Sequence, residues 1–457
     1  MPYYLSYAQQ TIEKENFTMA NRKNATTVEP ILPVRLGRNG EIHYARGMRA
    51  GRWIFTSGNM AQDFGSGISA SVVNSRLPYG GTPKHEREAA LIYDNVAEVL
   101  EQHGSGLSNV VRLDQYYPTW KAVDPYHVVR RARFGDHIAP STSMVMQGLL
   151  LPHADMDIQV IAITPDGDFQ VEHVEDSGLA GHVTSGYSAA VRAGDYVFIA
   201  GVTPSPLPGI PSRRGMAEEA QIMEGALWRG QAIKLEAEYV IRKKIIPSLE
   251  LAGSSLGNVV KAQVYMTHVD DFSAFNEVWR KYFPDNRPCT TLVPVPDPAI
   301  GTMYSRIEIN VLALTDSGKT RKEIIETDVF SGYEANSTAI RAGDLLFMSG
   351  LMAVDTDGLV QEAEIDTRQP NLQSSVRAQA ECILRNAEKI CKAAGTSLSN
   401  VVRAQQFHTD LRDFYDVHRV WQEHLPGQPI PFSAVEVPSP MPVPGCALQM
   451  DLWVYAP

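Results

Sequence analysis

The stretch LSNVVR at residues 107–112 returns as LGNVVK at residues 256–261 and again as LSNVVR at residues 398–403. Successive copies begin 149 and then 142 residues apart. The repeats of solenoid proteins reach only about 50 residues, so a period of this length indicates tandem whole domains. The chain of 457 residues is therefore predicted to contain three related domains.

A second motif recurs with the first. RAGRWIFTSG at residues 49–58 is echoed by RAGDYVFIAG at residues 192–201 and by RAGDLLFMSG at residues 341–350. Each copy is rich in β-branched and aromatic residues, as strands are.

The two motifs together divide the chain into four segments. We expect an N-terminal extension over residues 1–35 and three domains over residues 36–166, 175–316 and 323–457.

Each unit shows the same order of predicted elements. A β-rich run ends in Ser-Gly or Ala-Gly, and a helical pattern, a strand, a second helical pattern and two closing strands follow. The order β-β-α-β-α-β-β predicts an α+β domain with two helices on one face of a mixed sheet. The strands carry apolar residues on both sides, so the other face must also be covered. Three such sheets facing one another around a common axis would cover it.

Composition excludes several classes of function. Apolar residues make up 44% of the chain and charged residues 20%, so each domain can bury an ordinary core. The formal net charge of −11 argues against nucleic-acid binding, which needs clustered lysine and arginine. No apolar run approaches the ~20 residues that span a bilayer, and the N-terminus does not read as a signal peptide. We expect a cytoplasmic protein without membrane or nucleic-acid partners.

The sequence gives no pattern for a metal or cofactor. The four cysteines form no C-x-x-C pair, and the histidines do not cluster at metal-ligand spacing. We therefore expect free thiols, no metal and no cofactor.

These motifs resemble the YjgF/RidA family of imine and enamine deaminases. The resemblance rests on Ala-Gly-x-x-x-Phe-x-Ser-Gly, on Gly-x-x-Leu-x-Asn-Val-Val-Arg/Lys and on a closing Pro-x-x-Ser/Thr segment followed by an acidic strand. It implies chorismate-mutase-like (RidA-type) domains that assemble as trimers, with active sites between subunits. A chain with three such domains would form an intramolecular pseudo-trimer whose clefts are free to differ. The sequence leaves open whether such pseudo-trimers associate into a larger homo-oligomer.

The family's acidic residue on the final strand is matched by Asp157, Glu308 and Asp451, which we interpret as recurring at one strand position. A carboxylate there could orient or deprotonate a water molecule for attack on a carbon atom. The alternative is a structural ion pair with an arginine or lysine of a neighbouring strand or domain.

The resemblance also implies an arginine that holds the substrate carboxylate. The corresponding positions are taken to be Thr142, Thr290 and Phe432. Neither threonine nor phenylalanine replaces a bidentate guanidinium, so the substrate is expected to lack a free α-carboxylate. Arg306 or Arg287 could supply a cation from a shifted place, although Arg287 fits a solvated loop residue better.

Further substrate-binding residues follow from the same resemblance. The family's tyrosine on the first loop is matched by Tyr44 and Tyr187. The glycines after the first strand, Gly58, Gly201 and Gly350, could lend backbone N–H groups to a polar ligand. In the third unit, Phe432 and Trp453 either fill the cleft or shape it for a flat apolar ligand.

The function predicted from these features is a hydrolase that acts on a C–N bond of a small molecule in clefts between the domains. A neutral imine, an enamine or a cyclic amide would suit the threonines. The cleft expected to contain Tyr187, Thr290, Arg306 and Glu308 is the most polar. The alternatives are a non-catalytic protein that binds a metabolite and, disfavoured by the net charge, an endoribonuclease.

Overall fold

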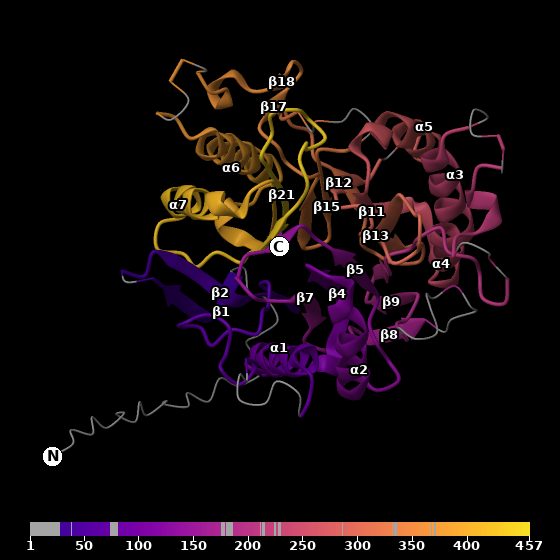
Figure 1. Cartoon of the computed structure of the whole chain (residues 1–457), viewed down its shortest axis with the longest axis horizontal. Coiled ribbons are helices and arrows are strands. Elements are labelled where there is room, and N and C mark those ends of the chain that lie inside the picture. The colour runs from indigo at the N-terminus through magenta and orange to yellow at the C-terminus, as the bar shows by residue number, and fades with distance from the viewer. Residues whose placement is uncertain are drawn as a thin grey trace.

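The computed structural model describes residues 28–457 except residues 38, 74–80, 175–178, 180–185, 211, 213–214, 224, 227–229, 286, 331, 333–335, 367 and 370–371. Most of the predicted N-terminal extension, residues 1–27, lies outside the described residues. Three domains lie around a common centre: the first is indigo to purple, the second runs from magenta to salmon and the third from orange to yellow (Figure 1).

Domain 1 is a six-stranded sheet with two helices. Its elements are β1 (Val28–Leu36), β2 (Ile42–Ala50), β3 (Trp53–Thr56), α1 (Lys84–Glu101), β4 (Val110–Tyr117), α2 (Val123–Phe134), β5 (Ser141–Val145), β6 (Gly148–Leu149) and β7 (Asp157–Ile163). The strand order is β1-β2-β3-β7-β4-β5, and β5 runs parallel to β4 at the edge.

Domain 2 repeats this plan. Its elements are β8 (Val171–Val174), β9 (Ala190–Ala193), β10 (Tyr196–Ile199), α3 (Ala232–Tyr239), a π-helical segment (Val240–Ile245), α4 (Ile246–Leu251), β11 (Ser254–Met266), α5 (Phe272–Tyr282), β12 (Cys289–Pro294) and β13 (Ile307–Thr315). The strand order is β8-β9-β10-β13-β11-β12. The π-helical segment ends two residues before Pro247, which has no N–H for the helix ladder.

Domain 3 follows the same order of elements. They are β14 (Lys322–Ile324), β15 (Ala339–Ala342), β16 (Leu345–Met348), β17 (Val354–Asp355), β18 (Gly358–Leu359), α6 (Ser375–Ala393), β19 (Val401–His408), α7 (Phe414–His424), β20 (Ser433–Glu436) and β21 (Leu448–Tyr455). The strand order is β14-β15-β16-β21-β19-β20-β6. The last strand, β6, comes from domain 1, so that domain completes the edge of its neighbour's sheet.

The predicted α+β fold with three tandem domains is confirmed, with one difference in element order. In each unit three strands of the main sheet come before the first helix, because the edge strands β1, β8 and β14 pair with β2, β9 and β15. The sequence hides these strands because they are short or partly exposed, and β1 contains Pro30 and Pro33. Strands β1 and β8 lie N-terminal to the expected domain starts at residues 36 and 175.

The three sheets cover one another with their helix-free faces, as expected. One cluster of buried residues draws aromatic side chains from every domain, among them Trp53, Phe55, Phe198, Phe347 and Trp453. Their rings meet edge to face: Trp53 and Tyr196 lie 5.0 Å apart at 87°, and Phe347 and Trp453 lie 4.7 Å apart at 85°. Such contacts stabilise beyond the area that they bury.

A second shared cluster also contains residues of all three domains. Tyr116, Tyr265 and Phe407 occupy equivalent positions in it, on the central strands β4, β11 and β19. Further along the same strands towards the aromatic cluster, polar and charged side chains are buried, among them Arg112, Lys261 and Arg403. The centre of the molecule is therefore layered: apolar, polar and apolar.

The aromatic cluster should couple the stability of the three domains. Trp53→Ala is expected to lower the free energy of unfolding by about 3–5 kcal/mol, because Trp53 is 1% exposed and contacts side chains of the second domain. Chemical denaturation followed by far-UV circular dichroism should still show one transition, with its midpoint at a lower denaturant concentration.

The matched control is Leu372→Ala, because Leu372 is 78% exposed; its transition should stay within about 0.5 kcal/mol of the wild type. A Trp53→Ala protein that loses only one third of its signal early, with the rest unfolding as in the wild type, would contradict this coupling.

Candidate functional site

Three equivalent backbone hydrogen bonds join the domains. In each, the N–H of a glycine that follows a strand donates to a carbonyl at or next to the start of β5, β12 or β20 in another domain: Gly201 to Ser141 (3.0 Å), Gly350 to Thr290 (3.1 Å) and Gly58 to Phe432 (2.8 Å). Each domain therefore presents its glycine to one neighbour and its edge strand to the other. We call the three contacts the 1/2, 2/3 and 3/1 interfaces.

These hydrogen bonds correct one prediction. The N–H groups of Gly58, Gly201 and Gly350 are already bonded to protein, so their predicted role as ligand donors was wrong. The lack of a side chain is what matters. A Cβ atom at Gly201 would lie 2.1 Å from Oε1 of Glu308, so a side chain there would force the carboxyl group to move.

The strand registers correct a second prediction. The bridges Asn59–Ile158, Val202–Ile309 and Leu351–Met450 are equivalent. The residues preceding their second members, Asp157, Glu308 and Gln449, therefore share one position. Asp451 is equivalent to Gln159 and Asn310 instead, so placing it with the other two acids was wrong by two residues. Residues i and i+2 of a strand lie on the same face. The alternation of apolar and polar residues therefore cannot reveal an alignment that is shifted by two residues.

A third correction concerns Thr142. The registers pair Asp114 with Thr142, Gln263 with Thr291 and Gln405 with Ser433. Ser141, not Thr142, is therefore equivalent to Thr290 and Phe432. In the sequence, Pro140 and Pro288 stand two residues before Thr142 and Thr290, which makes these threonines look equivalent, but the registers make Pro140 equivalent to Cys289.

The 1/2 interface surrounds Glu308 with polar groups of both domains. A Cβ atom at Gly201 would meet both the Glu308 carboxyl group and Oγ1 of Thr142, so these two groups flank the glycine. Thr142 accepts hydrogen bonds from Nη2 of Arg112 at 3.2 Å and from Nδ2 of Asn310 at 3.1 Å. Burial raises the pKa of Glu308 to about 8, although the positive charge of Arg112 opposes the shift. Glu308 is therefore a neutral carboxylic acid near pH 7.

Arg112 is held rigidly beside this acid. Its Nε and Nη2 donate to Asp114 at 3.1 Å and 2.7 Å, and its Nη1 donates to the carbonyl of Ile199 in domain 2 at 3.3 Å. Burial acts to raise the pKa of Asp114, but Arg112 and Arg403 lower it below its ordinary value. Asp114 is thus the ionised carboxylate and Glu308 the protonated one.

The residues expected to accompany Glu308 are only partly brought together. Tyr187 pairs with Ile138 at the 1/2 interface. Thr290 lies at the 2/3 interface, because its edge strand faces the other neighbour. Arg306 forms an ion pair with Asp271 at 2.5 Å, at the start of α5. The predicted grouping of Thr290 with Glu308 was wrong, and Thr142 takes that place.

The 2/3 interface has an amide where the other two have acids. Gln449 is fully buried beside Gly350, and neither of its side-chain polar atoms has a hydrogen-bond partner among the residues described. Thr291 accepts a hydrogen bond from Nζ of Lys261 at 2.8 Å. This interface has no acid at the position of Glu308.

Aromatic rings fill the 3/1 interface. Phe432 lies 5.2 Å from Tyr44 and 4.9 Å from Phe414, ring centre to ring centre. Asp157 accepts a hydrogen bond from Ser433 at 3.0 Å, and burial raises its pKa to about 7. Burial likewise raises the pKa of Tyr44 to about 12. Trp453 does not share this place, because it lies in the central aromatic cluster.

Sequence reasoning missed the buried cations. Arg112, Lys261 and Arg403 end the three copies of the repeated motif, and this recurrence was the available signal. Arg130 of α2 was missed as well. Its Nη1 donates to Ser141 at 3.2 Å and to Gln115 at 3.0 Å, so a buried guanidinium lies against the edge strand.

Other features of the described residues bear on ligands and membranes. No group of three or more His, Cys, Asp or Glu side chains among them could hold a metal ion. The four cysteines are buried and unpaired. None of the helices in the described part of the chain is long and apolar enough to cross a membrane.

Known proteins resemble each third of the chain. The family model described as Endoribonuclease L-PSP matches residues 39–164, 180–315 and 327–453. A RutC family protein of Pyrococcus abyssi is 34% identical over 109 residues, which cover 24% of this chain and 72% of that protein. Reactive Intermediate Deaminase A, chloroplastic, from Arabidopsis thaliana is 30% identical over 111 residues, 24% of this chain and 54% of that protein. The crystal structure of yeast Mmf1 is 25% identical with a TM-score of 0.25, covering 32% of this chain and 100% of that one.

Glu308 should make stability depend on pH in a defined window. Its pKa is about 8 in the folded protein against an ordinary value of 4.5, so between these values the folded state keeps a proton that the unfolded state has lost. Stability then falls as pH rises through this window. Glu308→Gln cannot titrate, so its melting temperature should fall less between pH 7 and pH 8 than that of the wild type.

Asp157→Asn is the matched control, because the raised pKa of Asp157, about 7, confines its effect mainly to lower pH. Thermal unfolding at several pH values between 5 and 9 measures all three proteins. Equal slopes for wild type and Glu308→Gln between pH 7 and pH 8 would contradict the protonated state assigned to Glu308.

Proposed function

We propose that this chain, which belongs to the endoribonuclease L-PSP family through all three of its domains, is a hydrolase that cleaves a C–N bond of a small molecule at the 1/2 interface. Glu308 is the proposed acid–base residue. One similar protein carries the name Reactive Intermediate Deaminase A, which agrees with chemistry at a C–N bond.

The observation that carries this proposal is the neutral carboxyl group of Glu308 beside the Thr142 hydroxyl. The other two interfaces differ from this one. Gln449 at the 2/3 interface cannot transfer a proton, and the aromatic rings of Phe432 and Tyr44 fill the 3/1 interface that contains Asp157. Burial and a specific charged neighbour are the conditions under which a shifted pKa indicates function.

The protonated acid suits the hydrolysis of an imine. Glu308 would donate its proton to the imine nitrogen while a water oxygen bonds to the carbon, and the carboxylate formed would take a proton from that water. Glu308 would then give this proton to the amine nitrogen, and its carboxylate would take the hydroxyl proton of the intermediate as the C–N bond breaks and the C=O bond forms. The products are a carbonyl compound and ammonia, so one water is consumed and Glu308 ends protonated. Glu308 is 5% exposed, so the substrate would reach it through an opening of the interface.

The surroundings of Glu308 favour a neutral substrate. None of the three equivalent positions Ser141, Thr290 and Phe432 carries an arginine. Arg112 is engaged by Asp114 through two nitrogen atoms, and Arg306 is engaged by Asp271. A substrate carboxylate would have to displace one of these ion pairs. Neutral imines, enamines and cyclic amides are therefore the proposed class. RNA cleavage is less favoured, because the net charge of −11 opposes binding to a phosphate backbone.

Glu308→Gln should abolish turnover while the protein stays folded. Removing a proton-transfer group typically lowers the rate by about 10²–10⁴-fold, and glutamine already occupies the equivalent position in domain 3. Release of ammonia from a panel of neutral imines, enamines and cyclic amides measures the rate, and circular dichroism checks the fold.

The same change at the 3/1 interface, Asp157→Asn, should leave turnover nearly unchanged. If Asp157→Asn abolishes turnover and Glu308→Gln does not, the wrong interface has been assigned. A wild-type protein that binds members of the panel without converting any of them would replace the proposal with a non-catalytic binding function.

A further inference from the structure

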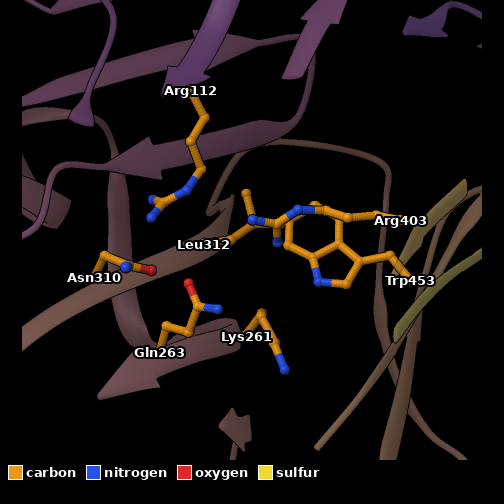
Figure 2. A pocket seen from close by; sticks show the side chains of 7 residues that line it. All are labelled: Arg112, Lys261, Gln263, Asn310, Leu312, Arg403 and Trp453. Carbon is orange, nitrogen blue, oxygen red and sulfur yellow. The ribbon is translucent and has the colours of Figure 1, made fainter. Parts of the chain in front are cut away.

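The polar layer at the centre of the molecule contains a cavity of about 10 Å³. Its lining comes from all three domains: Arg112, Lys261, Gln263, Asn310, Leu312, Arg403 and Trp453 (Figure 2). A space of this size holds about one water-sized body. Figure 2 shows the polar ends of Arg112, Asn310 and Gln263 pointing toward one another, with Arg403 lying along Trp453.

Among the described residues, three cations of this layer form ion pairs with two carboxylates. Arg112, Lys261 and Arg403 occupy equivalent positions on β4, β11 and β19, and none is more than 4% exposed. Asp114 pairs with both arginines, and Asp451 pairs with Lys261 at 3.0 Å.

The nearby acid Glu308 does not restore the balance near neutral pH, because it keeps its proton to about pH 8. One positive charge therefore remains uncompensated. Such a charge is unfavourable in a buried site.

Arg403 also has hydrogen-bond donors to spare. Its Nη2 donates to Asp114 and, at 3.4 Å, to Gln159. No hydrogen bond to its Nε or Nη1 occurs among the described residues, although its side chain is 2% exposed. The guanidinium lies 4.8 Å from the centre of the Trp453 ring, at the cavity wall.

Lys261 has no such capacity, because its Nζ already contacts Thr291, the carbonyl of Met348 and Asp451. Arg403 is therefore the residue with donors available to a guest in the cavity.

We propose that this cavity binds one halide ion, such as chloride, in contact with Arg403. The ion would supply the missing negative charge and accept hydrogen bonds from the unused N–H groups of Arg403. The small volume favours a monatomic ion over a larger organic acid. A water molecule would fit but would leave the positive charge uncompensated. Because the lining comes from all three domains, the ion would be a structural component of the domain assembly, separate from the chemistry proposed for Glu308.

Thermal unfolding in different sodium salts at constant ionic strength tests this site. Chloride and bromide should raise the melting temperature by roughly 2 °C for each tenfold increase above the dissociation constant, because only the folded state binds the ion. Gluconate is too large for the cavity and should have no such effect. A melting temperature that follows ionic strength alone, equally in all three salts, would overturn the proposal.

The variant Asn310→Asp places a carboxylate in the cavity wall and should remove the halide dependence. The control Gln361→Glu adds the same charge at an exposed position, and this variant should keep the halide dependence of the melting temperature. An unchanged halide response in a folded Asn310→Asp protein would place the ion outside this cavity.

Crystals of the wild type grown in bromide provide a measurement that does not depend on a variant. An anomalous diffraction peak in the cavity is expected. A cavity without such a peak would show that it holds water only, and this outcome leaves the proposed hydrolase function untouched.

Discussion

Each of the three sheets is apolar on both faces, and its own helices cover only one of them. This constraint determines most of the structure. The uncovered faces meet in one aromatic cluster to which every domain contributes, with Trp53, Phe198 and Phe347 among its members. Since no domain can bury its second face alone, the sheets must associate, and their edges must then meet at three interfaces. The candidate sites lie at these edges and not within any one domain.

One polypeptide with three unlike copies can give each interface a separate chemistry. The position held by Glu308 is held by Gln449 and Asp157 in the other domains, and a glycine faces each of them. Three outcomes result from one backbone arrangement: a neutral acid beside a threonine hydroxyl, an amide without partners among the described residues, and an acid bonded to Ser433 at an interface filled by aromatic rings. A homotrimer has identical subunits and could not separate these outcomes.

The buried polar layer connects the interfaces to the centre. Arg112 donates to Thr142 beside Glu308 and also lines the central cavity. Its partner Asp114 binds Arg403 of domain 3, so one carboxylate joins the first and third domains. Buried ion pairs of this kind contribute little net stability but are strongly unfavourable when broken. The layer therefore constrains how the domains pack more than it stabilises them.

The sequence by itself determined the number of domains, their α+β character and their mutual packing, because the repeated motifs and the two-sided apolar strands are local patterns. It also supplied Glu308, Asp157 and the interface glycines. Only the tertiary structure decided which residues are equivalent and which meet. A strand offers the same face at i and i+2, so Asp451 matched the pattern as well as Gln449 did. Likewise, no local sequence pattern shows which neighbouring domain an edge strand will contact. That contact places Thr142, and not Thr290, beside Glu308.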